Sequence, residues 1–340
     1  MKKHLAWKLA FLTFLILGTA FILHRQGAKQ LYLAQGQIFG TVYHIQYESD
    51  KNLDSLILSE LNAVDASLSM FNKNSTVSLI NRNASDNTDP LFREVFSLSK
   101  RISPQTQGAF DVTVAPLVNA WGFGFKLASS VAPHQIDSLL SFVGIEKVHL
   151  EGEKIVKDDS RVMLDFSSVA KGYGVDRVAR MFRSHGVKNF LIEIGGEISL
   201  EGEHPEGRPW KIGVNTPVDD SNPHSGDVFQ AFSITDAAMA TSGNYRRFYY
   251  KGGKRYAHTI DPKTGMPVSH SILSATVIAP DCATADAYAT AFMVLGVEKA
   301  KNVLKKHPEL MAYFIYDKGN GSFGTWMSPG LEKYAVKEGN

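Results

Sequence analysis

Strand-like segments outnumber helical segments in this chain, and several follow one another across short turns. Residues 190–194 form an apolar run that ends at Gly195 and Gly196, as a buried strand does. Lys251-Gly252-Gly253-Lys254 separates two further strand-like segments and is typical of a β-hairpin turn. Because parallel strands need long crossover connections, this order predicts an α+β protein with mostly antiparallel sheets and packed helices, and it argues against a Rossmann sheet.

The individual elements follow from the periodicity of their apolar residues. Strands are predicted at residues 39–47, 161–166, 190–194, 198–200, 210–214, 229–234, 247–250, 255–260 and 276–279. Residues 198–200 and 210–214 are expected to pair with each other. Helices are predicted at residues 53–68, 91–103 and 135–143, and a further helix is predicted after Ser168.

The first 25 residues differ from the rest of the chain. Lys2 and Lys3 precede an apolar segment at residues 5–23 that is interrupted by Lys8 and a few small residues. Its core has a length of about 15 residues, between that of a signal-peptide core and a full membrane span. Small residues at 18–20 suit signal peptidase, but the apolar run continues beyond them, which favours an uncleaved anchor. Cleavage of the leader stays an open question.

The lysines before the apolar core place the N-terminus in the cytoplasm by the positive-inside rule. The rest of the chain is then exported. We therefore expect a signal anchor or leader at residues 1–25, a tether at residues 26–35 and a folded domain at residues 36–335. The expected location is the inner membrane, with the folded domain on the periplasmic side. A buried N-terminal helix is disfavoured because the segment has no polar face.

Composition excludes several classes of protein. The net charge of +2 and the hydrophobic content of 44% are ordinary for a globular protein. No basic run with interleaved aromatic residues is present, so nucleic-acid binding is not expected. Cys282 is the only cysteine. This excludes an intrachain disulfide, a multi-cysteine metal site and a lipid-modified cysteine near the leader.

Residues 281–290 open an Ala-rich helix that is expected to run to about residue 295, with Gly296 as its stop. Asp286 and Thr290 are four residues apart, so on a helix they lie on one face, one turn apart. A carboxylate and a hydroxyl oxygen with little bulk around them suit a hard cation such as Mg²⁺. The alternative is an exposed Asp and a Thr that bonds to the preceding turn.

Residues 165–176 combine a strand end, a turn and a helix start. Free backbone N–H groups at that helix start, with Lys171 alongside, predict a phosphate-binding site. Gly172 and Gly174 weaken a helix, so a close backbone approach would explain them. The spacing is not that of a P-loop, and an ordinary capped helix is the alternative interpretation.

Three other places carry polar side chains of interest. Thr241, Ser242 and Gly243 supply hydroxyls and a flexible backbone in a turn after a strand. His258 is expected on a strand before a proline–glycine turn. Asp111 is a buried-looking carboxylate at the entry of a strand or helix. A lone histidine is usually structural, so none of these features alone predicts a site.

Taken together and in order, these segments closely resemble the ApbE family, the FAD:protein FMN transferases. The resemblance runs from Gly40 to about Gly296, most of the part expected to be exported. The matching blocks are residues 69–71 with 75–81, 108–113, 164–176, 194–197, 240–245, 258–267 and 285–290. Seven ordered blocks at family-like spacing are far more specific than any single motif.

The resemblance implies two lobes around a cleft that holds FAD. Its implied Mg²⁺ ligands are the Ala170 carbonyl oxygen, Asp286 and Thr290, in agreement with the helix argument. The implied FAD-binding positions are Phe39, Ser69, Met70, Phe71, Asp111, Lys171, Gly195, Gly196, Glu197, Thr241, Ser242, Gly243 and His258. Two positions depart from the family pattern. Phe39 replaces a Met, and Met70-Phe71 replaces Thr followed by Tyr or Trp, so a hydroxyl or indole N–H is lost at Phe71.

The implied reaction is attack of an acceptor Thr or Ser hydroxyl on the FMN-side phosphorus of FAD, with AMP leaving. Mg²⁺ and Lys171 would neutralise the pyrophosphate charge. His258 is the candidate for taking the hydroxyl proton, and Asp261 for orienting it. The implied acceptors are subunits of exported redox complexes of the Rnf and Nqr type. The alternatives are an FAD diphosphatase that releases FMN and AMP, and a non-catalytic exported flavin-binding protein.

Overall fold

The computed structural model describes residues 7–8, 11–19, 29–124, 131–218, 226–244, 248–251, 254–319 and 322–337. Residues 11–19 of the predicted leader are helical. Within the described ranges no helix is both long enough and apolar enough to cross a membrane. Most of the rest of the predicted leader, including residues 20–25, lies outside the described residues.

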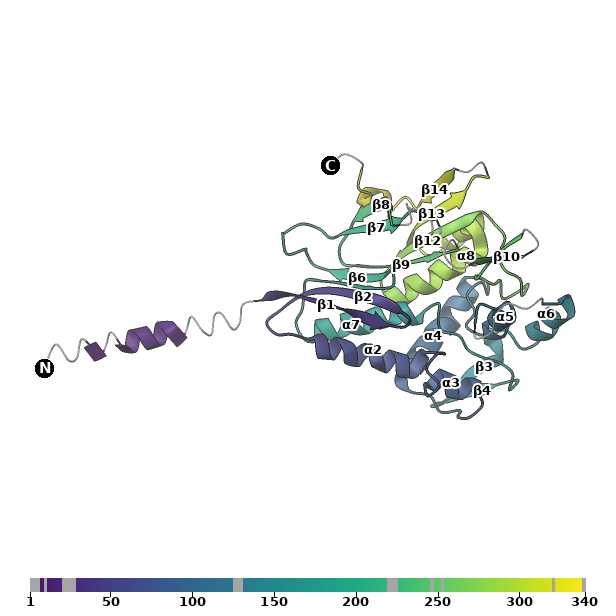
Figure 1. Cartoon of the computed structure of the whole chain (residues 1–340), viewed down its shortest axis with the longest axis horizontal. Helices are drawn as coiled ribbons and strands as arrows, with labels where there is room; N and C mark the ends of the chain where they lie inside the picture. Colours follow the sequence, from purple (N-terminus) through teal and green to yellow (C-terminus); the bar gives the residue numbers. More distant parts are fainter. Residues whose placement is uncertain are drawn as a thin grey trace.

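The fold is built on an eight-stranded sheet with the strand order β1-β2-β5-β6-β9-β12-β13-β14 (Figure 1). Its strands are β1 (Gln30–Ile38), β2 (Thr41–Ser49), β5 (Phe190–Ile194), β6 (Glu197–Glu201), β9 (Ala237–Gly243), β12 (Ile272–Ala279), β13 (Met311–Asp317) and β14 (Phe323–Met327). Smaller sheets pair β3 (Val148–Glu151) with β4 (Lys154–Lys157), β7 (Lys211–Asn215) with β8 (Val228–Ser233), and β10 (Phe248–Lys251) with β11 (Lys254–Ala257). All these pairs are antiparallel, which confirms the predicted fold class.

Within the described part of the folded domain, the α-helices are α2 (Asp54–Leu68), α3 (Thr76–Asn81), α4 (Pro90–Gln105), α5 (Ala115–Ala120), α6 (Pro133–Leu140), α7 (Ala170–Ser184) and α8 (Cys282–Leu304). Of these helices, α2, α7 and α8 pack on the large sheet, and the others pack on further helices or lie beside them. Helix α8 packs on β9 and β12, and α7 packs against α8 on one side and α2 on the other (Figure 1). Side chains cap the N-termini of α3 and α4. Ser75 accepts a hydrogen bond from the first turn of α3, and Asp89 accepts one from the first turn of α4.

Two hydrophobic clusters hold α7 and α8 in place. One contains the aromatic rings of Phe92 and Phe166, which meet edge to face, together with Phe292 of α8. The other joins β2, β5, α2 and α7 through Tyr47 and Phe182, whose ring centroids are 4.8 Å apart. Both helices are therefore fixed by packing on two sides, which gives the side chains between them defined positions.

The start of the folded domain differs from the prediction. Residues 30–35 were expected in a tether, but they belong to β1, which pairs with β2 from Gln30↔Ser49 to Ile38↔Thr41. The pairing with β2 makes the segment a strand, and Tyr32 stacks on Tyr47, the residue opposite it. Phe39 has a φ of +53° and lies in the turn between the two strands, so the strand predicted at 39–47 begins at Thr41.

Two strand predictions are wrong. Residues 161–166 are not in a sheet. The backbone of Leu164 instead exchanges hydrogen bonds of 2.7 and 2.8 Å with the side-chain amide of Asn81. The predicted pairing of 198–200 with 210–214 is also absent, because β6 pairs with β5 and β9 while β7 pairs with β8. An apolar pattern identifies the buried face of a strand, but it does not identify the strand with which it pairs.

The predicted helix end at Gly296 is half correct. Gly296 has a φ of +73° and interrupts the helical geometry. Helical residues then resume and continue to Leu304.

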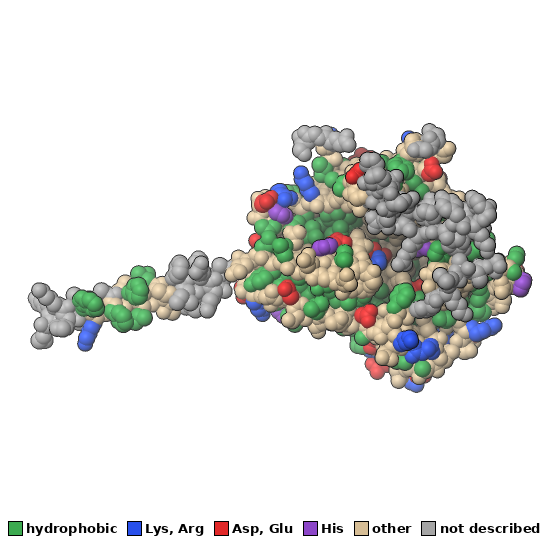
Figure 2. Space-filling view, viewed as in Figure 1, with side chains coloured by type: hydrophobic (Ala, Val, Ile, Leu, Met, Phe, Trp, Pro, Cys, Tyr) green, Lys and Arg blue, Asp and Glu red, His purple; other side chains and the backbone are tan. Residues whose placement is uncertain are grey.

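On the face seen in Figure 2, acidic and basic side chains are interspersed over the folded domain.

Candidate active site

The centre of the site is a very close contact between α7 and α8. The backbone N–H of Gly172 donates a hydrogen bond to Oδ2 of Asp286 at 3.1 Å. A Cβ on Gly172 would lie 2.4 Å from the carbonyl oxygen of Cys282, and a Cβ on Gly174 would lie 2.7 Å from the ring of Phe39. The close backbone approach predicted for these glycines is therefore an approach to α8 and to the β1–β2 turn.

Asp176 fixes the start of α8 from the neighbouring helix. Its carboxylate accepts hydrogen bonds of 2.8 Å from the N–H groups of both Cys282 and Ala283. Asp281 caps the same helix end by accepting from the N–H of Thr284. Burial, reinforced by the nearby charge of Asp281, raises the pKa of Asp176 to about 7. No local pattern predicts this cap, because Asp176 and its partners are more than 100 residues apart along the chain.

Asp286 and Thr290 lie on one face of α8, as their spacing predicts. Asp286 is 2% exposed, so the alternative of an exposed carboxylate is wrong. Burial raises the pKa of Asp286, and the ammonium of Lys171 opposes that change. The hydroxyl of Thr290 is 3.2 Å from the hydroxyl of Ser242 on β9. The two predicted oxygen donors thus face other polar groups within the fold.

Lys171 and Glu197 form an ion pair between α7 and β6. The side chain of Glu197 is 2% exposed and that of Lys171 is 30% exposed. Burial acts to lower the pKa of Lys171, but Glu197 and Asp286 together hold that pKa above its ordinary value. Oε2 of Glu197 is buried and has no hydrogen-bond partner within the described residues. The cluster therefore contains two buried carboxylates and one ammonium.

Two hairpin turns meet beside this cluster. Gly195 has a φ of +61°, and its N–H donates to the carbonyl oxygen of Val42 at 3.0 Å. The β1–β2 turn at Phe39 touches α7 at Gly174. The β5–β6 turn at Gly195 and Gly196 leads directly into Glu197. The structure thus brings four predicted positions, Phe39, Gly195, Gly196 and Glu197, to the same end of the sheet as Lys171.

The donors present at the start of α7 fit a magnesium ion. Asp286 would supply one carboxylate, Thr290 a hydroxyl and Ala170, the first residue of α7, a carbonyl oxygen. In the part of the chain that the structure describes, no three His, Cys, Asp or Glu side chains are placed to hold a metal. Mg²⁺ is commonly held by one or two carboxylates together with water and substrate phosphates. Oε2 of Glu197, which has no hydrogen-bond partner within the described residues, would accept a hydrogen bond from a water molecule or substrate group bound beside the ion.

Thr241, Ser242 and Gly243 lie in a strand and not in the predicted turn. They form the end of β9 and pair with Ser274 to Thr276 of β12. The hydroxyl of Thr241 is 2.9 Å from that of Thr276, and the hydroxyl of Ser242 is 3.2 Å from that of Thr290. A role for Thr241, Ser242 and Gly243 in FAD binding stays a prediction. The apparent turn composition was misleading because small residues are needed here for α8 to pack on the sheet.

Asp111 is occupied by structural hydrogen bonds. Oδ1 accepts from the N–H and the hydroxyl of Thr113, and Oδ2 accepts from the N–H of Ile145 at 2.9 Å. Burial raises the pKa of Asp111 against these hydrogen bonds. The carboxylate therefore fastens the 111–113 turn to the loop at 144–145. Its role in FAD binding stays a prediction.

The segment after α2 presents one aromatic ring to the surface. Met70 is buried and Phe71 is 72% exposed. The turn is held because the hydroxyls of Ser75 and Ser78 donate to the carbonyl oxygen of Ser69. Phe71 is thus displayed on a structured turn. A flavin contact at Ser69, Met70 and Phe71 stays a prediction.

His258 follows β11 and does not lie on it, because β11 ends at Ala257. Its ring is 6.3 Å from that of Phe123, edge to face. Oδ1 of Asp261 accepts from the N–H of Lys263 at 2.9 Å, and the carbonyl oxygen of Asp261 accepts from Gly265. Asp261 therefore closes its own turn. The orientation of His258 by Asp261 stays a prediction.

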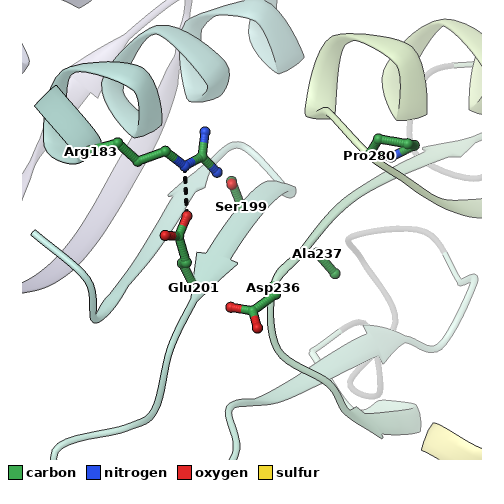
Figure 3. Close-up of a pocket in the computed structure, with 6 residues that line it drawn as sticks. All are labelled: Arg183, Ser199, Glu201, Asp236, Ala237 and Pro280. Carbon is green, nitrogen blue, oxygen red and sulfur yellow. Dashed lines mark hydrogen bonds and ion pairs between the residues drawn. The ribbon is translucent and has the colours of Figure 1, made fainter.

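A cavity of about 350 Å³ lies away from these residues (Figure 3). Its lining includes Arg183, Ser199, Asp236 and Glu201, and Arg183 pairs with Glu201 at 2.6 Å. Glu201 ends the strand β6 that begins at Glu197. The cavity is thus at the opposite end of that strand, and none of the predicted site residues lines it.

The chain is similar to known proteins over most of its length. The ApbE family model matches residues 39–314. The FAD:protein FMN transferase of Haemophilus influenzae is 37% identical over 316 residues, which cover 88% of this chain and 90% of that protein. The FAD:protein FMN transferase of Escherichia coli (strain K12) is 34% identical over 327 residues, 92% of each chain.

Solved structures show the same fold. The flavin transferase ApbE from Vibrio cholerae superposes with a TM-score of 0.80 at 33% identity, covering 90% of this chain and 99% of that one. The apo form of Pseudomonas stutzeri flavinyl transferase ApbE also gives a TM-score of 0.80, at 29% identity and covering 90% and 97%. With a family model that spans most of its length and relatives above 30% identity, the chain belongs to the ApbE family.

Proposed function

We propose that the protein is a Mg²⁺-dependent FAD:protein FMN transferase that attaches FMN to a Thr or Ser hydroxyl of an exported acceptor and releases AMP. As a member of the ApbE family whose curated relatives carry that enzyme name, it is a flavin-transferring enzyme. The observation that carries the finer proposal is the cluster at the α7–α8 contact, in which the buried carboxylates of Asp286 and Glu197 lie beside the ammonium of Lys171.

The charges of this cluster suit a pyrophosphate substrate. When bound, Mg²⁺ would offset the negative charge of the diphosphate and of the leaving AMP. Asp286, Thr290 and the Ala170 carbonyl oxygen would hold the ion, because they are oxygen donors on two helices in contact. The ammonium of Lys171, kept charged by its neighbours, adds a second positive group.

The reaction requires one proton transfer. The acceptor oxygen forms a bond to the FMN-side phosphorus, and the bond from that phosphorus to the oxygen of AMP breaks. The hydroxyl proton passes to a base, for which we propose His258. A histidine suits this role because its ordinary pKa lies near neutral pH. The ring of His258 is half-buried and positioned beside Phe123.

We further propose that the acceptors are exported subunits of Rnf- or Nqr-type redox complexes. The apolar segment at residues 5–23, preceded by lysines, supports an enzyme anchored in the inner membrane with its folded domain on the periplasmic side. An anchored enzyme and an exported acceptor would then share one compartment.

The test is incubation of the protein with FAD, Mg²⁺ and a purified Rnf- or Nqr-type subunit, followed by intact-protein mass spectrometry. The proposal predicts an acceptor heavier by one FMN less one water, with the label on a Thr or Ser in peptide maps. An acceptor left at its original mass while FAD is converted to free FMN and AMP would show a diphosphatase instead. Unchanged FAD would exclude both activities for this pair of proteins.

A further inference from the structure

The ion pair between Lys171 and Glu197 has a role beyond that of holding two elements together. We infer that Glu197 is a positioning residue that keeps the ammonium of Lys171 away from Asp286 and so leaves Asp286 available to a divalent cation. This inference rests on the proposed metal site at Asp286. Glu197 determines which of the two buried carboxylates, its own or that of Asp286, pairs with the ammonium of Lys171.

Lys171 has two anionic neighbours but pairs with one of them. Among the ion pairs of the described residues, its ammonium is joined to Glu197 and not to Asp286. Asp286 is nonetheless close enough to act on the charge of Lys171. The two are also near along the backbone, because the N–H that binds Asp286 belongs to Gly172, the next residue after Lys171.

The choice of partner matters because both carboxylates are buried. Asp286 and Glu197 are each 2% exposed. In such a setting an ammonium is strongly attracted to any unpaired carboxylate within reach. If Glu197 lost its charge, the remaining anion near Lys171 would be Asp286. An ammonium placed on Asp286 would neutralise the charge that a cation needs and would occupy the same space.

The hydrogen bonds of Glu197 also differ from those of a structural carboxylate. Asp111, which fastens two loops, uses both of its oxygens in bonds to the protein. Glu197 uses Oε1 for Lys171, while its buried Oε2 has no partner within the described residues. The backbone of Glu197 is fixed in β6, opposite Ile194 of β5. The principal contact of this carboxylate is therefore the ammonium of Lys171.

The experiment measures Mn²⁺ binding to the full-length protein by electron paramagnetic resonance, with no FAD or acceptor present. Mn²⁺ serves as the probe because it takes the same oxygen ligands as Mg²⁺. Glu197→Gln should weaken Mn²⁺ binding by roughly tenfold or more, since Lys171 is then released onto Asp286. In a Lys171→Met background the same substitution should change Mn²⁺ affinity little, because the competing ammonium is gone.

A second variant separates position from charge. Glu197→Asp keeps the negative charge but draws the carboxylate back from Lys171 by one methylene, so it should also weaken Mn²⁺ binding. If Glu197→Asp binds Mn²⁺ like the wild type, or if Glu197→Gln has an equal effect with and without Lys171, the inference is wrong. Melting curves establish that each variant is folded, and Glu197→Asp carries the test if Glu197→Gln does not fold.

Asp286→Asn distinguishes this inference from the proposed metal site itself. Wild-type Mn²⁺ affinity in Asp286→Asn would show that the metal site is elsewhere. Loss of binding in Asp286→Asn, combined with wild-type binding in both Glu197 variants, would keep the metal site and overturn only the role assigned to Glu197.

Discussion

The backbone amide of Gly172 donates a hydrogen bond to Oδ2 of Asp286 at 3.1 Å, and this bond joins the first turn of α7 to the carboxylate-bearing turn of α8. Asp176 makes a second connection from α7 to the N-terminus of the same helix. The spacing of the two helices is thus set on both sides of the cluster. Small changes in that spacing should affect activity directly.

Gly172→Ala tests the close contact between the helices. Alanine in a helix is ordinarily more favourable than glycine by about 1 kcal/mol. Here its Cβ would lie 2.4 Å from the backbone carbonyl of Cys282. We expect a net loss of about 1–3 kcal/mol in unfolding free energy, together with a large fall in Mg²⁺-dependent transfer. Gly226→Ala is the control, because nothing lies within 4 Å of its added Cβ. Equal denaturant midpoints for the two variants would contradict the packing account.

Asp286→Asn tests the metal carboxylate while it keeps an acceptor for the Gly172 amide. The loss of negative charge should reduce Mg²⁺-dependent transfer by about 10² or more, because the ion loses its anionic protein ligand. Thr290→Val should reduce it less, since water can replace a neutral oxygen. Steady-state rates across a Mg²⁺ titration measure both effects. Wild-type transfer by a folded Asp286→Asn protein would show that the metal assignment is wrong.

His258→Asn should separate chemistry from binding. As the base, His258 would contribute roughly 10² to 10⁴ to the rate, so transfer should slow by that factor while FAD affinity changes little. FAD titration and single-turnover transfer measure the two quantities separately. His149→Asn, at a partly exposed histidine on β3, is the control and should behave like the wild type. A normal single-turnover rate in folded His258→Asn would remove His258 from the mechanism.

The pKa of Asp176 predicts a pH dependence of stability. Burial raises this pKa from 3.8 to about 7 in the native state. The native protein therefore keeps a proton that the unfolded chain releases, and the resulting stability is full below about pH 4 and is lost as the pH rises to about 7. Asp176→Asn does not titrate, so its melting temperature relative to the wild type should rise across that window and stay level above it. A difference that is the same at pH 4 and pH 8 would show that Asp176 ionises normally.

The parts of the site that the sequence predicted are those with local spacing. Asp286 and Thr290 were recognisable because helical periodicity alone puts residues four apart on one face. Gly195 and Gly196 were recognisable because an apolar run ended there. In both cases the relevant distance along the chain is a few residues.

The remaining parts depend on contacts between distant segments. The Lys171–Glu197 ion pair and the Asp176 cap each join residues that are far apart along the chain. No local sequence pattern predicts that these residues meet. Gly172 was correctly read as a point of close approach, but the partner, the backbone of Cys282, is determined by the packing of α7 on α8. Strand β1 has no strand pattern that local residues alone predict, because its pairing with β2 is what makes it a strand.

The most direct measurement of the central claim is the balance of products in a single reaction of protein, FAD, Mg²⁺ and an exported acceptor. Released AMP, free FMN and acceptor-bound FMN are quantified together by chromatography and mass spectrometry. The account predicts that AMP and acceptor-bound FMN appear in equal amounts, with little free FMN, and that a metal chelator stops both. AMP matched by free FMN, with no flavin on the acceptor, would contradict it.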